Sequence, residues 1–184
     1  MMYMVMFIII TVFIVGLMSG RTPEYLNMKI TGRDVLLVMI AFLIHPIIIL
    51  VPTVVSYASG AASAIGISGN SIGYTQILYE FTSAAANNGS DFLGAQANTP
   101  FFNIATAIVM FVGRYAPIFI LLALSGSMIG RKRGGTTSGL KTDTLIFTLV
   151  LVASIIILVV LTFFPFLAVG PIASYFRGLV NSFG

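Results

Sequence analysis

Residues 71–85 form a stretch that is too short and too polar to cross a bilayer, yet it lies between two apolar segments long enough to do so. Lipid offers no hydrogen bonds, so non-helical backbone at membrane depth survives only where protein or a water-filled path satisfies it. A short helix that stops there leaves its last carbonyl groups unpaired and aims the negative end of its dipole at the residues that follow. Those residues are Ala86, Asn87, Asn88, Gly89 and Ser90. The pattern predicts a re-entrant helix followed by a pore loop for a cation.

The composition is that of an integral membrane protein. Hydrophobic residues make up 58% of the 184 residues and charged residues only 8%, whereas about a quarter of the residues in a soluble domain are charged. A membrane-spanning helix needs roughly 20 apolar residues, and four segments qualify: 1–18, 35–57, 104–128 and 145–169. We therefore predict an all-α integral membrane protein with four transmembrane helices, one re-entrant pore helix and a filter loop.

The basic residues predict the orientation of these helices. They gather after the first and third spans, at Arg21, Lys29, Arg33, Arg131, Lys132, Arg133 and Lys141. The positive-inside rule therefore makes loops 21–34 and 129–144 cytoplasmic. The connection 58–103 contains no Lys or Arg, so we expect it and both termini to lie outside.

The predicted organisation follows from these spans, with a membrane-pore-membrane repeat at its centre. The segments are a first helix (1–20), a cytoplasmic loop (21–34), a repeat (35–128) with its pore loop (71–91), a second cytoplasmic loop (129–144), a final helix (145–169) and an extracytoplasmic tail (170–184). A filter built from backbone carbonyls needs a ring of loops, and we find no second repeat here. The chain must therefore assemble with segments that supply the others.

Composition also excludes several functions. The absence of cysteine rules out disulfides, thiolate metal sites and cysteine nucleophiles. The net charge of +4 is divided between helix-flanking loops instead of forming one basic face, which argues against nucleic-acid binding.

The turn at residues 86–90 is the main candidate for ion binding. Gly89 permits dihedral angles that let successive carbonyls point the same way, and the Asn side chains could brace the loop. Alternatively, Asn88 and Gly89 form an ordinary surface turn, and residues 88–90 match a glycosylation acceptor. Asn70 or Ser71 could cap the preceding helix.

Three charged side chains accompany this turn. Arg114 lies well inside the third predicted span, where a charge needs compensation. It is either a fixed positive charge beside the ion path or a member of a buried pair with Glu80 or Asp91. Glu80 and Asp91 would themselves concentrate cations at an outer mouth.

A membrane hydrolase using His45, Glu80 and Asp91 is a further reading. It is poor because no nucleophile motif or pair of metal ligands accompanies these residues. His45 directly precedes Pro46 in the second span, a place where Pro permits a helix kink, and its role there is more simply structural.

Several separated motifs, in order, give the chain a close resemblance to a known family. They comprise Gly20, Arg21, Thr22, Pro23, Glu24, Tyr25 and Leu26; then residues 87–90; then Ala97, Asn98, Thr99, Pro100 and Phe101; then Gly113 and Arg114; then Leu161, Thr162, Phe163, Phe164 and Pro165; and last Gly170, Pro171 and Ile172. With these motifs the chain resembles the C-terminal third of the potassium-binding subunit of the Kdp potassium-transporting ATPase.

The resemblance implies a fold of four pseudo-equivalent membrane-pore-membrane repeats around one potassium filter, related to the Trk, Ktr and HKT transporters. Residues 35–128 would form the fourth repeat, the turn at 86–90 one quarter of the filter, and Arg114 the pore-side arginine. Potassium would be the transported ion, no organic cofactor is expected, and ATP would act only through a partner. The implied partners are the remaining repeats, a P-type ATPase subunit, small accessory membrane subunits and the lipid of a prokaryotic cell membrane.

Two positions depart from the family pattern: Ala86 stands where another Asn is common, and Asp91 where a small residue is common. These departures leave the filter geometry and the ion affinity open. The alternative reading is a non-conducting structural or assembly subunit, or an inactive fragment, whose helices still pack.

Overall fold

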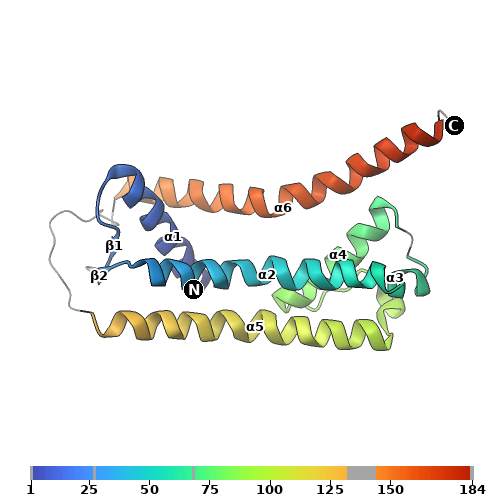
Figure 1. The fold of residues 1–184 in the computed structure, drawn as a ribbon, viewed down its shortest axis with the longest axis horizontal. Coiled ribbons are helices and arrows are strands. Elements are labelled where there is room, and N and C mark those ends of the chain that lie inside the picture. Colours follow the sequence, from blue (N-terminus) through green and yellow to red (C-terminus); the bar gives the residue numbers. More distant parts are fainter. Residues whose placement is uncertain (1, 27, 68, 132–143, 183–184) are drawn as a thin grey trace. The chain divides into compact units, whose positions relative to one another are not determined.

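The computed structural model describes residues 2–26, 28–67, 69–131 and 144–182 (Figure 1). The helices and strands, in order, are α1 (Met2–Ser19), β1 (Glu24–Tyr25), β2 (Met28–Lys29), α2 (Gly32–Ala58), α3 (Ala61–Ala64), α4 (Ser71–Ala86), the 3₁₀ helix η1 (Gly94–Ala97), α5 (Pro100–Ile129) and α6 (Leu145–Ser182). They form two compact units. Unit 1 is Met1–Leu43 with Ala116–Val160, and unit 2 is Ile44–Tyr115 with Leu161–Gly184.

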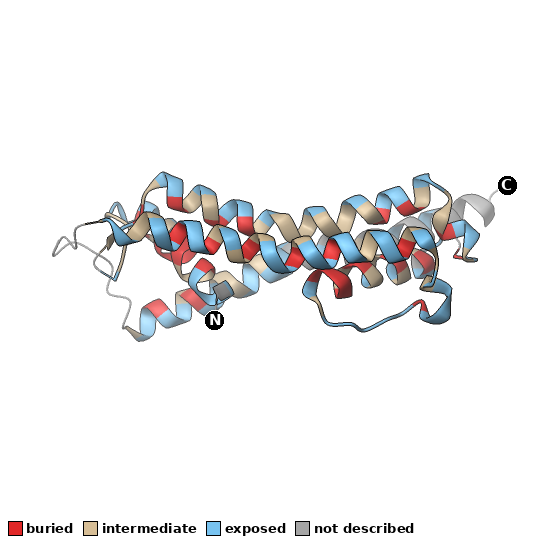
Figure 2. Cartoon of the chain, turned by 90° about the horizontal axis from the view of Figure 1, so that it is seen from below, coloured by how far each residue is buried: buried red, intermediate tan, exposed pale blue. Residues whose placement is uncertain are grey.

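Among the described residues, α2 and α5 are long and apolar enough to cross a membrane. Each is continuous through its prolines, because a helix that loses one hydrogen bond to proline still satisfies the rest of its backbone. Figure 2 shows exposed residues along both helices, and many of these are large and apolar, as on a surface that meets lipid. The expected membrane character of the chain is therefore supported.

The two terminal helices are apolar over shorter stretches, Tyr3–Ser19 and Leu145–Leu161. Helix α6 does not stop near residue 169 as predicted but continues to Ser182. The predicted tail 170–184 is thus helical over most of its length. A helix tolerates glycine and proline where neighbouring backbone bonds persist, so Gly170 and Pro171 do not end it.

The predicted loop 21–34 contains a small antiparallel hairpin, which the all-α prediction missed. Glu24 pairs with Lys29 and Tyr25 with Met28, and the N–H of Ile30 donates to the carbonyl of Pro23 at 2.9 Å. Most of the second predicted cytoplasmic loop, 129–144, lies outside the described residues, including Lys132, Arg133 and Lys141.

The core of unit 1 is formed by α1, the start of α2, the end of α5 and the start of α6. Its buried members are Met6, Ile9, Ile10, Val12, Ile30, Val38, Ala41, Leu121, Leu124, Phe147 and Leu151. Phe7 and Phe42 meet edge to face at its border, with ring centroids 5.8 Å apart. Packing of this kind fixes helix positions because closely packed side chains leave few alternatives.

The core of unit 2 holds α4 between the later part of α2 and the first part of α5. Its buried members are Ala62, Ile67, Ile77, Phe81, Ala84, Ala85, Leu93, Phe102 and Val109. Phe81 of α4 stacks on Phe102 of α5 at 6.0 Å. Asn70 caps α4 as predicted, since its side chain accepts a hydrogen bond from the N–H of Gly73 at 2.8 Å.

The segment between α2 and α4 is packed into the core of unit 2. The short helix α3 forms in it, and Ala62 and Ile67 are buried. Burying these two apolar residues in the unit 2 core ties the segment down on the way into α4.

Candidate functional site

Helix α4 ends in a left-handed turn where the predicted filter loop begins. Asn87 has φ 56° and ψ 36°, a conformation that Asn tolerates better than most residues. The N–H of Asn87 donates to the carbonyl of Ala84, and the N–H of Asn88 to that of Ser83, both at 3.0 Å. The expectation that the last carbonyls of this helix are unpaired is therefore wrong for Ser83 and Ala84.

The side chain of Asn87 ties this turn to α5. Its amide nitrogen donates to the backbone carbonyl of Met110 at 3.2 Å and lies 3.4 Å from the carbonyl of Ala85. One amide group thus bridges carbonyls of two helices. The sequence predicts that Asn side chains brace this loop, and the contacts of the Asn87 amide show how such a brace is made at that position.

Hydroxyl groups hold the other end of the turn against α4. The Tyr79 hydroxyl donates to Ser90 Oγ at 3.1 Å, and Ser83 Oγ lies 2.9 Å from the same atom. Gly89 between these anchors has φ 75°, a conformation that costs glycine little. Residues 88–90 are exposed between these two fixed ends.

Helix α5 makes its close approach to the end of α4 at Gly113. A Cβ atom at this position would lie 3.1 Å from the carbonyl carbon of Ala85 and would overlap its oxygen. Only glycine lets the two backbones meet in this way. Because Met110 is one turn away on α5, Gly113 and the Asn87 bridge fix the same junction.

The sequence also matches a known protein family. A model of the family described as KdpA, potassium-transporting ATPase A subunit, matches residues 1–176. The chain belongs to the KdpA family. The family expected from the separated motifs is therefore confirmed. In a KdpA chain, the junction of α4 with α5 is a candidate ion-binding element.

The similar relatives carry the name potassium-transporting ATPase potassium-binding subunit. The relative from Alicyclobacillus acidocaldarius is 52% identical over 168 residues, which cover 91% of this chain. Those from Gloeobacter violaceus and Clostridium acetobutylicum are 48% and 47% identical and cover 97% and 95% of it. The chain spans only about 30% of the length of these relatives.

Arg114, the predicted pore-side charge of this KdpA chain, follows Gly113 on α5. Its side chain is exposed, and among the described residues the ion pair found joins other residues, Arg131 and Asp34. One of the two roles predicted for Arg114 is an ion pair with Glu80 or Asp91. The structure does not show that pair.

Glu80 and Asp91 are brought together with each other instead. Each side chain lies close enough to shift the pKa of the other, and Glu80 is half-buried on α4. Burial and the neighbouring Asp91 raise the pKa of Glu80 to about 7, although a backbone hydrogen bond from Phe92 opposes the shift. The predicted role of these two carboxylates as outer-mouth charges stays a prediction, and Glu80 is only partly exposed to solvent.

The hydrolase reading gains no support. In the described part of the chain, no group of three or more His, Cys, Asp or Glu side chains could hold a metal ion. His45 lies half-buried inside the continuous helix α2.

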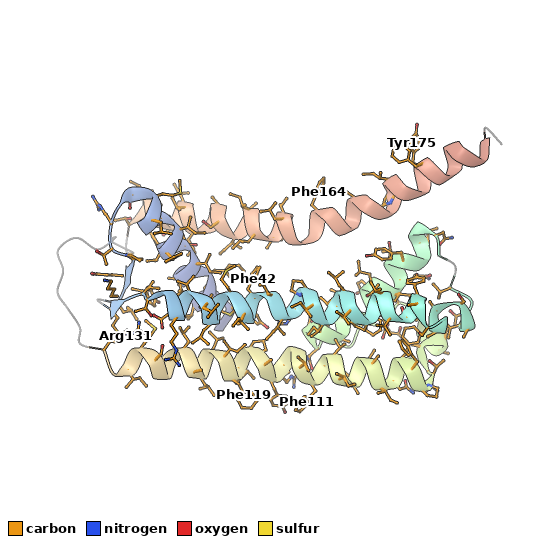
Figure 3. All side chains as sticks on the ribbon, in the orientation of Figure 1. Phe42, Phe111, Phe119, Arg131, Phe164 and Tyr175 are labelled. Atoms are coloured by element: carbon orange, nitrogen blue, oxygen red, sulfur yellow. The ribbon has the colours of Figure 1, made fainter. Side chains whose placement is uncertain are left out.

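Sequence reasoning missed one polar cluster, which lies in unit 1. The buried carboxylate of Asp34 receives the guanidinium of Arg131, the hydroxyl of Ser127 at 2.8 Å, and the N–H and hydroxyl of Thr31, both at 2.8 Å. Figure 3 shows Arg131 beside the C-terminal end of α5. The signal was present, because Thr31 and Asp34 have capping-box spacing ahead of an apolar run.

Proposed function

We propose that this chain supplies one quarter of the potassium filter of a Kdp-type potassium uptake complex. Potassium would be bound mainly by backbone carbonyls of residues 86–90: Ala86, Asn87, Asn88, Gly89 and Ser90. The chain would correspond to the C-terminal third of the A subunit, with the last helix of a third repeat, a whole fourth repeat at 35–128 and the final helix. Potassium is the transported ion in this proposal, which involves no organic cofactor.

The observation that carries the proposal is the exposed turn at residues 88–90, held at both ends. Asn87 fixes its start to Met110 of α5, and Ser90 is fixed to Tyr79 and Ser83 of α4. A filter must present carbonyl oxygens without rearranging, and a loop with fixed ends and a glycine at positive φ supports that requirement. The membership of the chain in a potassium-transporting family supplies the choice of ion.

One such loop cannot enclose an ion, so the complete site requires other loops. We propose that the remaining potassium-channel-like repeats complete the filter, on a separate chain or elsewhere in the same protein. ATP hydrolysis would belong to a P-type ATPase subunit, with small accessory membrane subunits in the same complex.

The proposed topology has four membrane-crossing helices and one re-entrant helix, α4. Loops 21–34 and 129–144 would face the cytoplasm of a prokaryotic cell, while the pore loop 71–91 and both termini would face outward. Arg114 would stand beside the ion path, and its exposure in this chain leaves it accessible to that path.

A non-conducting assembly subunit is the alternative. This alternative requires the helices to pack, but it does not explain why the turn at residues 86–90 is held at both ends. The family match and the bracing of this turn therefore favour the potassium-binding reading.

The test uses the tagged chain in its native membrane, with its partners recovered and identified. Potassium-stimulated ATPase activity of the purified complex is measured with the unmodified chain and with Gly89→Asp. The substitution places a side chain at φ 75° inside the turn and should raise the potassium concentration for half-maximal stimulation at least about tenfold, or about 1.4 kcal/mol of binding free energy.

Gly94→Asp is the matched control, because Gly94 also has a positive φ, 60°, and also faces open space. It lies outside the proposed filter, so it should leave potassium dependence close to that of the unmodified complex. An equal effect of both substitutions, or recovery of the chain without a potassium response, would support the assembly reading instead.

A further inference from the structure

Gly89 stands between two residues that both contact Ser83 of α4. The N–H of Asn88 donates to the backbone carbonyl of Ser83 at 3.0 Å, and Ser90 Oγ is hydrogen-bonded to Ser83 Oγ at 2.9 Å. One residue of the helix therefore holds the turn on both sides of its glycine, once through the main chain and once through the side chain. These two contacts form a clamp on the turn.

Ser83 is a firm anchor for this clamp. It is only 4% exposed, and it lies near the end of α4, beside Ala84 and Ala85 of the unit 2 core. A buried hydroxyl needs a hydrogen-bond partner, because leaving it unpaired in an apolar environment costs free energy. Ser90 supplies that partner, so burial of Ser83 favours the clamped form of the turn.

The hydroxyl of Tyr79, one turn earlier on α4, supports the same contact. It donates to Ser90 Oγ at 3.1 Å, and its ring packs against that of Phe92 with the centroids 5.6 Å apart. A serine hydroxyl can donate one hydrogen bond and accept two, so Ser90 can serve both partners at once. The side chain of Ser90 is therefore held on α4 by two hydroxyl groups.

We infer that Ser83 is a positioning residue that sets the ion selectivity of the proposed filter, with the Tyr79 hydroxyl assisting it. The inference rests on the proposed function and deepens it. Sodium is smaller than potassium, so carbonyl oxygens must move inward to replace its hydration shell. A turn clamped on both sides of Gly89 resists that movement, whereas a turn that has lost one of the two contacts can make it. The clamp therefore disfavours sodium.

Ser83→Ala is the main test, because it removes the hydroxyl and keeps the carbonyl that accepts from Asn88. The ATPase activity of the complete native complex is measured over a range of potassium concentrations and, separately, of sodium concentrations. We expect the ratio of the sodium KM to the potassium KM to fall about fivefold, the effect of one lost hydrogen bond. An unchanged ratio would overturn the inference, since a merely structural serine would lower the yield of the complex and leave the ratio alone.

Two further variants separate the clamp from general damage to α4. Tyr79→Phe keeps the aromatic ring and removes the second hydroxyl group, so it should lower the ratio in the same direction by a smaller factor. Thr82→Val is the matched control, because the Thr82 hydroxyl donates to the carbonyl of Leu78 within α4 at 2.7 Å. Its loss should leave the ratio unchanged. A fall in Thr82→Val as large as that in Ser83→Ala would contradict a specific role for the clamp.

Hydrogen exchange of the Asn88 amide gives a readout that does not depend on transport. This amide keeps its acceptor in Ser83→Ala, but the clamp predicts faster exchange there once Ser90 is released, and unchanged exchange in Thr82→Val. Unchanged exchange in Ser83→Ala would overturn the clamp. With the expected exchange pattern, absence of potassium stimulation in the unmodified complex would overturn the proposed function, whereas potassium stimulation with an unchanged KM ratio in Ser83→Ala would overturn the selectivity role alone.

Discussion

Gly113 of α5 lies directly opposite the backbone carbonyl of Ala85, at the end of α4, and leaves no room there for a side chain. The two positions are 28 residues apart in the sequence, and both belong to unit 2. The residue after Ala85 is the first of the proposed filter, so the closeness of the two helices decides where the filter turn starts.

Gly113→Ala should therefore separate α4 from α5. A methyl group would be forced against backbone, which cannot rotate away, and overpacking of this kind costs about 1–3 kcal/mol. We expect a lower thermal midpoint of the complex and weaker potassium dependence. Gly126→Ala on the same helix is the control, because that position faces open space and alanine favours helix over glycine. Equal midpoints for the two variants would contradict the predicted contact.

The amide of Asn87 should matter apart from its backbone conformation. Asn87→Gly keeps the left-handed turn accessible but removes the hydrogen bond to Met110, which should cost about 0.5–1.5 kcal/mol. Hydrogen exchange in the last turn of α4 should become faster. Asn88→Gly, at an exposed neighbouring position, should change that exchange less; the reverse order would show that the bridge to α5 does not hold this turn.

Removing Arg131 should destabilise unit 1. The side chain of Asp34 is only 1% exposed, whereas that of Arg131 is 23% exposed, so Arg131→Met leaves a carboxylate buried without its ion-pair partner. Loss of one partner from a buried pair typically costs about 3–5 kcal/mol. Arg33→Met, at the exposed position beside Asp34, provides the control. A thermal midpoint in Arg131→Met equal to that of the control would refute this assignment.

Stability near the turn should depend on pH through Glu80. Its pKa in the folded chain is raised from 4.5 to about 7, mainly by burial and then by Asp91. Between these values the folded state binds the proton more tightly than the unfolded state, so stability falls as pH rises through about 7. Thermal unfolding of the potassium-free complex from pH 5.5 to pH 8 should show this fall.

Glu80→Gln is the control for the pH dependence, since glutamine does not titrate. Its midpoint should vary less over the same range. A pH dependence that is the same in both proteins would mean that another group carries it.

Features of single segments were predictable from the sequence. A short helix is expected at 71–85, and α4 occupies Ser71–Ala86 with Asn70 as its cap. These features depend on local hydrogen bonding and on apolar patterning, which neighbouring residues carry. The family followed from short motifs for the same reason.

Contacts between distant residues could not be predicted in this way. The sequence does not show that Glu80 and Asp91 lie near each other, and it leaves open whether Arg114 pairs with either of them. Glu80 lies less than two turns from the end of α4, but only the left-handed residue Asn87 and the return of the chain at Ser90 bring Asp91 back to it.

The sequence by itself determined the membrane character, the long apolar helices, the cap of α4 and the family, because hydropathy, capping and motif identity are properties of contiguous residues. Tertiary structure alone decided which polar groups meet: Asn87 with Met110, Ser90 with Tyr79 and Ser83, and Asp34 with Arg131. The physical reason is that an apolar environment makes an unpaired polar group costly. Each group therefore takes the partner that packing brings within reach, and packing is a property of the folded chain.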